Sequence, residues 1–318
     1  MVNNLNKRNK IMTHGLPIVI DLPENFLAPE VRCGYNVPMK LKKIWAVELD
    51  LLAKLDEICK KYSLRYQVCY GTMIGAIRHK GFIPWDDDMD VWLPREDYDK
   101  LCEVAPRELS NPYFLQTALS DRRFFNPFAR LRNSETTAVV TELNSVDYNN
   151  GIFIDVYPLD RAAPTHFKDV IQIEAQRFAL RCATLHCQDK KRSGSWRRRL
   201  SHLIRPIVRC VSYVQWVKMY ENAIRKYSGL RTDYAPLFSL CPHERAQRLS
   251  DSDVTESIYV DYEFMKVPVP RNYDELLRCY YGDYMTFPPE QERGKWHEGQ
   301  IIFDPDVSYK KFMNTEIA

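Results

Sequence analysis

The stretch GFIPWDDDMDVWLPREDYDKL, residues 81–101, places four aspartates within five positions and surrounds them with large apolar side chains. Asp88 and Asp90 alternate with Met89 and Val91, so on a strand both carboxylates point to one face while the apolar residues enter the core. Neighbouring carboxylates repel each other, and a positive charge is expected beside them. The pattern predicts a site for Mg²⁺ or Mn²⁺, with a solvated acidic turn as the alternative.

A third carboxylate comes from a second apolar stretch, GIFIDVYPLD, at residues 151–160. Asp155 stands there between Ile154 and Val156, in the middle of a predicted strand. A charged group in such a place is costly unless it is paired or ligates a metal. We therefore expect Asp155 to complete the metal site, whereas Asp160 at the end of the strand is predicted to form a turn or a helix cap.

Groups that could hold an anion precede the acidic stretch. A predicted strand at residues 65–70 ends at Gly71, and residues 72–81 have the pattern of one or two helical turns. A helix that opens there would direct the backbone N–H groups of Gly71 and Thr72, and the Thr72 hydroxyl, at a phosphate. Arg78 follows, and its guanidinium suits phosphate because it can bind with two hydrogen bonds.

Three further residues are candidates for substrate contact. Arg130 and Arg132 share one face of a predicted strand at residues 128–132, where they would bind donor phosphates or the acceptor, or form surface ion pairs. His297 lies in a region rich in polar and aromatic residues, where it would contact substrate or serve a structural role.

The order of the elements predicts the fold class. An amphipathic helix at 39–64 precedes mainly strands up to residue 160, and two helices, at 165–188 and 200–227, follow before a strand at 260–269 and a helix at 273–281. This order indicates an α+β fold, a mixed sheet core with flanking helices and a helical C-terminal part. We expect an N-terminal extension (1–38), a catalytic core (39–160), a helical basic segment (161–230) and a C-terminal part that completes the site (231–318).

The composition narrows the class of protein. The chain has 318 residues, 45% of them hydrophobic, and a net charge of +3, which gives no argument for a nucleic-acid partner. The chain has nine cysteines, an odd number, and no two of them form a C-x-x-C motif. This pattern predicts reduced thiols in a cytosolic protein. No stretch has the pattern of a signal peptide or of a membrane span, so a cytoplasmic location is expected.

One basic segment, residues 190–220, offers a possible link to a membrane. It carries Arg197, Arg198 and Arg199 beside Trp196 and an apolar helical stripe. The segment is predicted to be either an ordinary amphipathic helix packed on the core or a peripheral foothold on anionic lipid at the inner face of the membrane.

Four blocks of the sequence together resemble the LicD family, which includes bacterial phosphocholine transferases and, more distantly, fukutin and fukutin-related protein. The blocks are Gly71-Thr72, residues 75–101, residues 151–160 and YGDYMTFPPEQER at 281–293. The resemblance implies a nucleotidyltransferase-like fold and Mg²⁺-dependent transfer of a phospho-alcohol, phosphocholine above all, from a CDP-activated donor. The implied acceptor is a sugar hydroxyl of a cell-surface glycan such as lipopolysaccharide or teichoic acid, free or lipid-linked, and CMP is released.

By the same resemblance, Gly71 and Thr72 match the phosphate-cradling pair, Asp88 and Asp90 the metal-binding pair, and Asp155 the third acid; Asp86 matches a further acid of the repeat. Asp155 would orient or deprotonate the acceptor, or only hold the metal. Two alternatives stay open: nucleotidyl transfer with release of pyrophosphate, and a non-catalytic protein that binds or scaffolds at a membrane surface.

Overall fold

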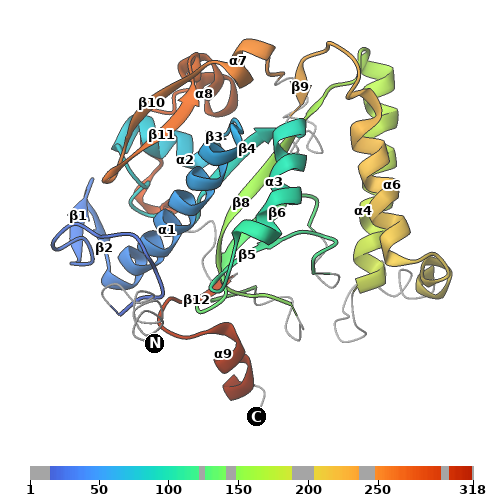
Figure 1. The fold of residues 1–318 in the computed structure, drawn as a ribbon. Coiled ribbons are helices and arrows are strands. Elements are labelled where there is room, and N and C mark those ends of the chain that lie inside the picture. Colours follow the sequence, from blue (N-terminus) through green and yellow to red (C-terminus); the bar gives the residue numbers. More distant parts are fainter. Residues whose placement is uncertain are drawn as a thin grey trace.

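A six-stranded mixed sheet forms the centre of the protein, which we describe from a computed structural model (Figure 1). The structure describes residues 15–121, 126–140, 148–187, 204–235, 248–294 and 301–316. Five strands run in the order β3-β4-β8-β6-β5, and the short β9 pairs with the end of β8. Their bounds are β3 Gln67–Val68, β4 Asp90–Pro94, β5 Tyr113–Gln116, β6 Ala129–Asn133, β8 Ile152–Arg161 and β9 Tyr234–Ala235.

Strand β8 lies at the middle of this sheet and decides how the site is built. It pairs parallel with β4 and antiparallel with β6, and nine of its ten residues are buried. A strand buried on both faces reads as a nearly continuous apolar run, which is the pattern of residues 152–159. The two acids inside this strand, Asp155 and Asp160, are therefore placed in the protein interior and need partners there.

Two helices pack against the sheet and against each other, α1 (Met39–Tyr62) and α3 (Arg95–Glu108). Helix α1 ends at Ser63, which adopts a left-handed φ of 54° and lets two N–H groups bond the last carbonyls. Helix α3 begins after Pro94 and carries Glu96 and Asp97 in its first turn, where the helix dipole favours negative charge. Helix α1 was predicted from the sequence to within two residues.

The last predicted strand, residues 260–269, is wrong as a single element. The chain forms a hairpin there, β10 (Ser257–Tyr262) and β11 (Met265–Pro270), with Tyr262 opposite Met265. Two-residue turns need a positive φ, and Glu263 supplies one of 52° although glycine or asparagine is the usual choice. The Glu263 carboxylate also accepts hydrogen bonds from Arg32 and from the N–H of Phe82, so the hairpin holds the start of the acidic stretch.

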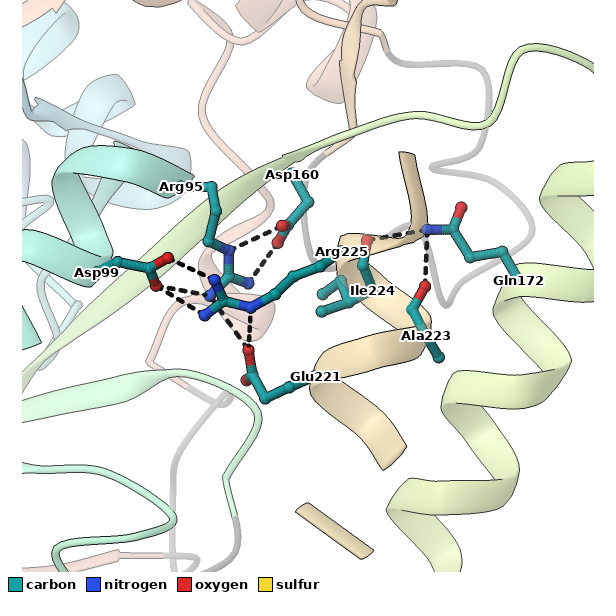
Figure 2. A network of polar contacts seen from close by, with 8 residues as sticks. All are labelled: Arg95, Asp99, Asp160, Gln172, Glu221, Ala223, Ile224 and Arg225. Atoms are coloured by element: carbon teal, nitrogen blue, oxygen red, sulfur yellow. Dashed lines mark hydrogen bonds and ion pairs between the residues drawn. The ribbon is translucent and has the colours of Figure 1, made fainter. Parts of the chain in front are cut away.

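The helices α4 (His166–Cys187) and α6 (Tyr213–Ile224) lie antiparallel beside the sheet, on the right in Figure 1. Figure 2 shows how they are attached: Arg95 donates two hydrogen bonds to Asp160, at 2.7 and 2.5 Å. Glu221 and Arg225 of the helical pair join this network, and Arg225 also bonds Asp99. The predicted turn or cap at Asp160 is therefore wrong, because the residue lies within β8 and its carboxylate accepts its hydrogen bonds from the buried guanidinium of Arg95.

The remaining elements are short or peripheral. Small antiparallel pairs form between β1 and β2 and between β12 and β7. The bounds are β1 Glu30–Arg32, β2 Tyr35–Val37, α2 Tyr70–Ile74, the π-helix η1 Gly75–His79, β7 Thr137–Val140, η3 Arg225–Tyr227, α7 Asp251–Thr255, α8 Tyr273–Tyr281, η5 Glu290–Glu292, β12 Ile301–Asp304 and α9 Tyr309–Glu316. The α+β class with a mixed sheet and flanking helices is confirmed.

Candidate active site

Three charged residues form a row across neighbouring strands of the sheet. Asp90 opens β4 and lies opposite Asp155 of β8, and Asp155 in turn lies opposite Arg130 of β6. Residues in register on adjacent strands direct their side chains to the same face, so the three groups are neighbours. Residues 90 and 155 are 65 positions apart in the chain, and the parallel pairing of β4 with β8 brings them together.

The surroundings of Asp90 disfavour its charged form. Burial raises the pKa of its carboxyl well above the usual range, and the carboxylates of Asp88, Asp155 and Asp86 raise it further. A hydrogen bond from Tyr157 acts in the opposite direction. Several acids that disfavour one another's ionisation create a site of strong negative potential, which a cation would relieve.

A fourth acid, Glu48 of α1, belongs to the same region. Its side chain is 1% exposed, and neither carboxylate oxygen has a hydrogen-bond partner among the described residues. Burial raises its pKa well above the usual value, and the charges of Asp88, Asp87, Asp86 and Asp90 add to the effect. Sequence reasoning missed Glu48, although it occupies an apolar position of the amphipathic helix, three residues after Trp45 and four before Leu52.

The turn between β3 and α2 is fitted closely around the acidic stretch. A Cβ atom at Gly71 would come within 3.1 Å of an Asp86 carboxylate oxygen, so a side chain there would crowd the acid. The hydroxyl of Thr72 is buried and accepts a hydrogen bond of 2.8 Å from the N–H of Asp90. Thr72 thus fixes the start of β4, and its predicted contact with phosphate, like that of Gly71, stays a prediction.

Arg130 and Arg132 share one strand face as predicted, since both guanidinium groups lie over the ring of Phe153, at 3.7 and 4.8 Å. Arg130 donates to Asp155 at 2.7 and 3.4 Å. Arg132 is 1% exposed and donates to the side chain of Gln116 and to the carbonyl of Gly151. Arg130 therefore belongs to the acid row, whereas Arg132 is buried and bonded to other groups of the protein.

The other predicted contacts lie apart from this row. Arg78, at the end of η1, donates to the carbonyls of Tyr284 and Thr286 and to His79. Burial together with the charges of Arg78 and Arg32 lowers the pKa of His79 to about 4, so the imidazole is neutral at neutral pH. His297 lies outside the described residues.

Tyrosine side chains surround the acid row. The Tyr157 hydroxyl donates to Asp155 at 3.3 Å, and the ring of Tyr157 meets the ring of Tyr70 edge-on at 5.6 Å. Tyr70 itself adopts a φ of 48°, a strained conformation for a bulky residue. Burial raises the pKa of Tyr281, and Asp90 adds to the rise, which places that hydroxyl near the acids. Aromatic faces beside acids are suited to an organic cation.

The acid set matches a hard divalent cation in its chemistry. All of the donors are carboxylate oxygens, which Mg²⁺ and Mn²⁺ prefer, and their mutual repulsion would fall when a cation binds. Within the described part of the chain, no three Asp, Glu, His or Cys side chains are gathered tightly enough to form a complete metal site. The protein therefore offers paired carboxylates, and substrate or water would supply the remaining ligands.

Comparison with known proteins identifies the class of domain. Residues 63–186 match the family model described as LicD/FKTN/FKRP, nucleotidyltransferase domain. This range contains the acidic stretch, Asp155 and Arg130. By this match, residues 63–186 have a nucleotidyltransferase-like fold.

Relatives make the assignment more specific. A "Lipopolysaccharide cholinephosphotransferase LicD" from Haemophilus influenzae is 29% identical over 266 residues, which cover 81% of this chain and 96% of that protein. An uncharacterized protein of Rickettsia prowazekii is 31% identical over 109 residues, 34% of this chain and 39% of that protein. The match of residues 63–186 to the LicD family model agrees with the resemblance that the sequence motifs indicated.

Proposed function

We propose that the protein transfers phosphocholine from a CDP-activated donor to a sugar hydroxyl of a cell-surface glycan, such as lipopolysaccharide, and releases CMP. The single observation that carries the proposal is the register of Asp90 with Asp155 inside a LicD-family domain. The Haemophilus influenzae relative, which aligns over most of both chains, is named as a lipopolysaccharide cholinephosphotransferase. This name supports the choice of phosphocholine and of a lipopolysaccharide-like acceptor.

Asp88 and Asp90, with Asp155 and Asp86, would hold one or two Mg²⁺ (or Mn²⁺) ions. Such an ion, when bound, neutralises the charge that develops on the leaving phosphate. The four carboxylates would gain from it because their repulsion is relieved, and the charges of Asp88, Asp155 and Asp86 add to the raised pKa of Asp90.

In the proposed step, the acceptor oxygen forms a bond to the phosphorus of phosphocholine while the bond from that phosphorus to the CMP oxygen breaks. The acceptor proton passes to Asp155 or, by way of Asp155, to solvent. Arg130 holds the Asp155 carboxylate in one orientation through contacts of 2.7 and 3.4 Å. The tyrosines around the row offer ring faces to the choline group.

An assay with purified protein, Mg²⁺, an acceptor glycan and a panel of CDP-alcohols tests this function. We expect release of CMP with CDP-choline, and none in excess EDTA. Release of pyrophosphate from a nucleoside triphosphate in place of CMP would support the nucleotidyltransferase alternative. Absence of any turnover, with the fold intact, would favour a non-catalytic binding protein.

Asp155→Asn separates its two roles in the same assay. If Asp155 orients the acceptor, the variant binds CDP-choline with nearly unchanged affinity by calorimetry while transfer falls by roughly 10²-fold or more. An equal loss of donor binding would make Asp155 a metal ligand only.

We also infer a peripheral contact between anionic lipid and the outer face of α4. Phe167, Ile171 and Phe178 are 73%, 45% and 55% exposed and lie on one helical stripe, with exposed Lys168 and Arg181 beside them. Trp196 and Arg197–Arg199 of the predicted basic segment lie outside the described residues. Among the described residues, no helix is both long enough and apolar enough to span a bilayer.

Co-sedimentation with anionic liposomes tests the lipid contact. Phe167→Ser should lower the bound fraction, and Arg197, Arg198 and Arg199 changed together to Gln should lower it further, because each basic residue contributes about 1 kcal/mol near such a surface. Transfer to soluble acceptors should stay the same. Wild-type protein that ignores these liposomes at low salt would rule the contact out.

A further inference from the structure

Two arginines from distant parts of the chain meet beside the acidic stretch. Arg78 ends the π-helix η1, and Arg293 follows the short helix η5, more than 200 positions later. Their guanidinium groups lie 5.0 and 5.6 Å from the ring centre of Phe287, so that one aromatic side chain contacts both. Arg293 also lies 4.8 Å from the ring of Trp85, the residue directly before Asp86.

Among the described residues, no carboxylate pairs with either arginine. Arg78 donates to the carbonyls of Tyr284 and Thr286 and to His79, and Arg293 donates to the carbonyl of Pro288, all of them neutral acceptors. In the described ranges of the chain, neither guanidinium forms an ion pair. Burial lowers the pKa of Arg78, and the charge of Arg293 lowers it further, as expected for two like charges placed close together.

Two other arginines, by contrast, have carboxylate partners. Arg32 pairs with Glu263 and Glu30, and Arg278 of α8 pairs with Asp274. Arg278 even lies over an aromatic ring, at 5.9 Å from Tyr284, as Arg78 and Arg293 do over Phe287. Arg278 therefore contacts both a ring and a carboxylate. Among the described residues, Arg78 and Arg293 contact a ring but no carboxylate.

Aromatic rings lie around the pair, and part of one ring is exposed. Phe287 is 37% exposed, and the neutral ring of His79 stacks on it at 5.4 Å. Trp85 stands edge-on to both rings, at 6.0 and 5.9 Å. These aromatic contacts fix the positions of the two guanidinium groups, which lowers the entropy lost when they bind an anion.

We propose that Arg78 and Arg293 form a binding site for the diphosphate of the nucleotide donor. A diphosphate carries several negative charges, and its terminal oxygens accept hydrogen bonds. A guanidinium group can bind two of these oxygens at once with parallel hydrogen bonds. Acids alone would repel a phosphate, so the reaction needs fixed positive charge near the acidic stretch, and this pair supplies it where Arg293 contacts Trp85, the residue before Asp86. The choice of donor rests on the proposed function, whereas the affinity for diphosphate does not.

Calorimetric titration of the full chain with inorganic pyrophosphate and with CDP, in EDTA and at fixed ionic strength, tests the site without turnover. Arg293→Gln and Arg78→Gln should each weaken binding of both ligands roughly tenfold or more, the usual scale for a lost charge-assisted hydrogen bond. Arg293→Lys should recover part of the loss. The matched control, Arg278→Gln, removes an arginine that also covers a ring but is already paired, and should change affinity less than about twofold.

Each outcome decides the proposal. Arg78 also ties η1 to residues 284–286, and Arg293 contacts the rings of Trp85 and Phe287 as well as the carbonyl of Pro288, so both variants are read together with thermal unfolding. Unchanged pyrophosphate affinity in Arg293→Gln, or a wild type that does not bind millimolar pyrophosphate, would overturn the site. Loss of binding in both variants, in a protein that never releases CMP from CDP-alcohols, would support the site and reject the proposed function.

Discussion

Strand β8 carries two buried acids five residues apart, and each is bonded to an arginine, but the charges around the two pairs differ. Asp160 faces Arg95, which donates two hydrogen bonds to it, and the wider network joins two guanidinium groups to three carboxylates (Figure 2). Burial raises the pKa of Asp160, but Arg95 acts against that rise. Asp90 lies opposite Asp155 in the sheet. Burial and the neighbouring acids both raise the pKa of Asp90.

The difference separates an acid used for structure from acids kept for chemistry. A buried ion pair that satisfies its own charges attaches one part of a protein to another, as Arg95 and Asp160 attach the α4–α6 pair to the sheet. A cluster in which burial and like charges raise the pKa of an acid loses stability, and such clusters are typical of sites that bind a ligand or perform a reaction. Three substitutions test this distinction.

Asp90→Asn should give the largest effect. Transfer should fall by roughly 10²- to 10³-fold or more, the scale seen when an electrostatic group of an active site is removed. The free energy of unfolding without divalent cation should stay the same or rise, because one of several repelling carboxylates becomes neutral. CMP release and urea unfolding measure the two quantities. Asp88→Asn should behave in the same way, and full activity in either variant would contradict the metal proposal.

Arg95→Met should lower the stability of the fold, in contrast to Asp90→Asn. It leaves Asp160 buried without its guanidinium, and removal of one partner of a buried pair costs about 3–5 kcal/mol in the free energy of unfolding. The double variant Arg95→Met/Asp160→Leu should recover most of this loss, because it buries no charge. Urea unfolding measures both, with the exposed Arg278→Gln as a control that should change stability by less than about 0.5 kcal/mol. Equal stability of the single variant and the wild type would show that the network contributes little.

Glu48 gives the smallest and most specific test, through the pH dependence of stability. Its pKa is raised in the folded state, so above its ordinary value of 4.5 the folded protein holds a proton that the unfolded chain has released. The stability contributed by that proton is lost as pH rises through the raised value, with a slope of at most about 1.4 kcal/mol per pH unit.

Glu48→Gln should therefore flatten the fall in stability from pH 5 to 8 when no divalent cation is present. Glu57→Gln, which changes an exposed acid of the same helix, should leave the slope as it is. Urea unfolding at several pH values distinguishes the two variants. An unchanged slope in Glu48→Gln would mean that its carboxylate is balanced in solution.

Sequence alone determined the parts of this protein that depend on neighbours along the chain. The alternation of acids with apolar residues at 86–91, the amphipathic pattern of α1 and the Pro94 start of α3 each follow from local side-chain spacing. The LicD-family motifs added the class of domain. These features were predictable because a strand or helix shows in its own sequence which of its faces is buried.

What lies opposite that face was decided only by tertiary structure. Periodicity placed Asp155 and Asp160 on one strand, but it did not show that one would meet Arg130 and the other Arg95. It gave no sign that Glu48 would be buried against the acids, or that Arg293 would reach Arg78 across more than 200 residues. Charge balance at a buried site is set by which elements the fold brings together, because interactions between charges depend on distance in space and not on separation along the chain.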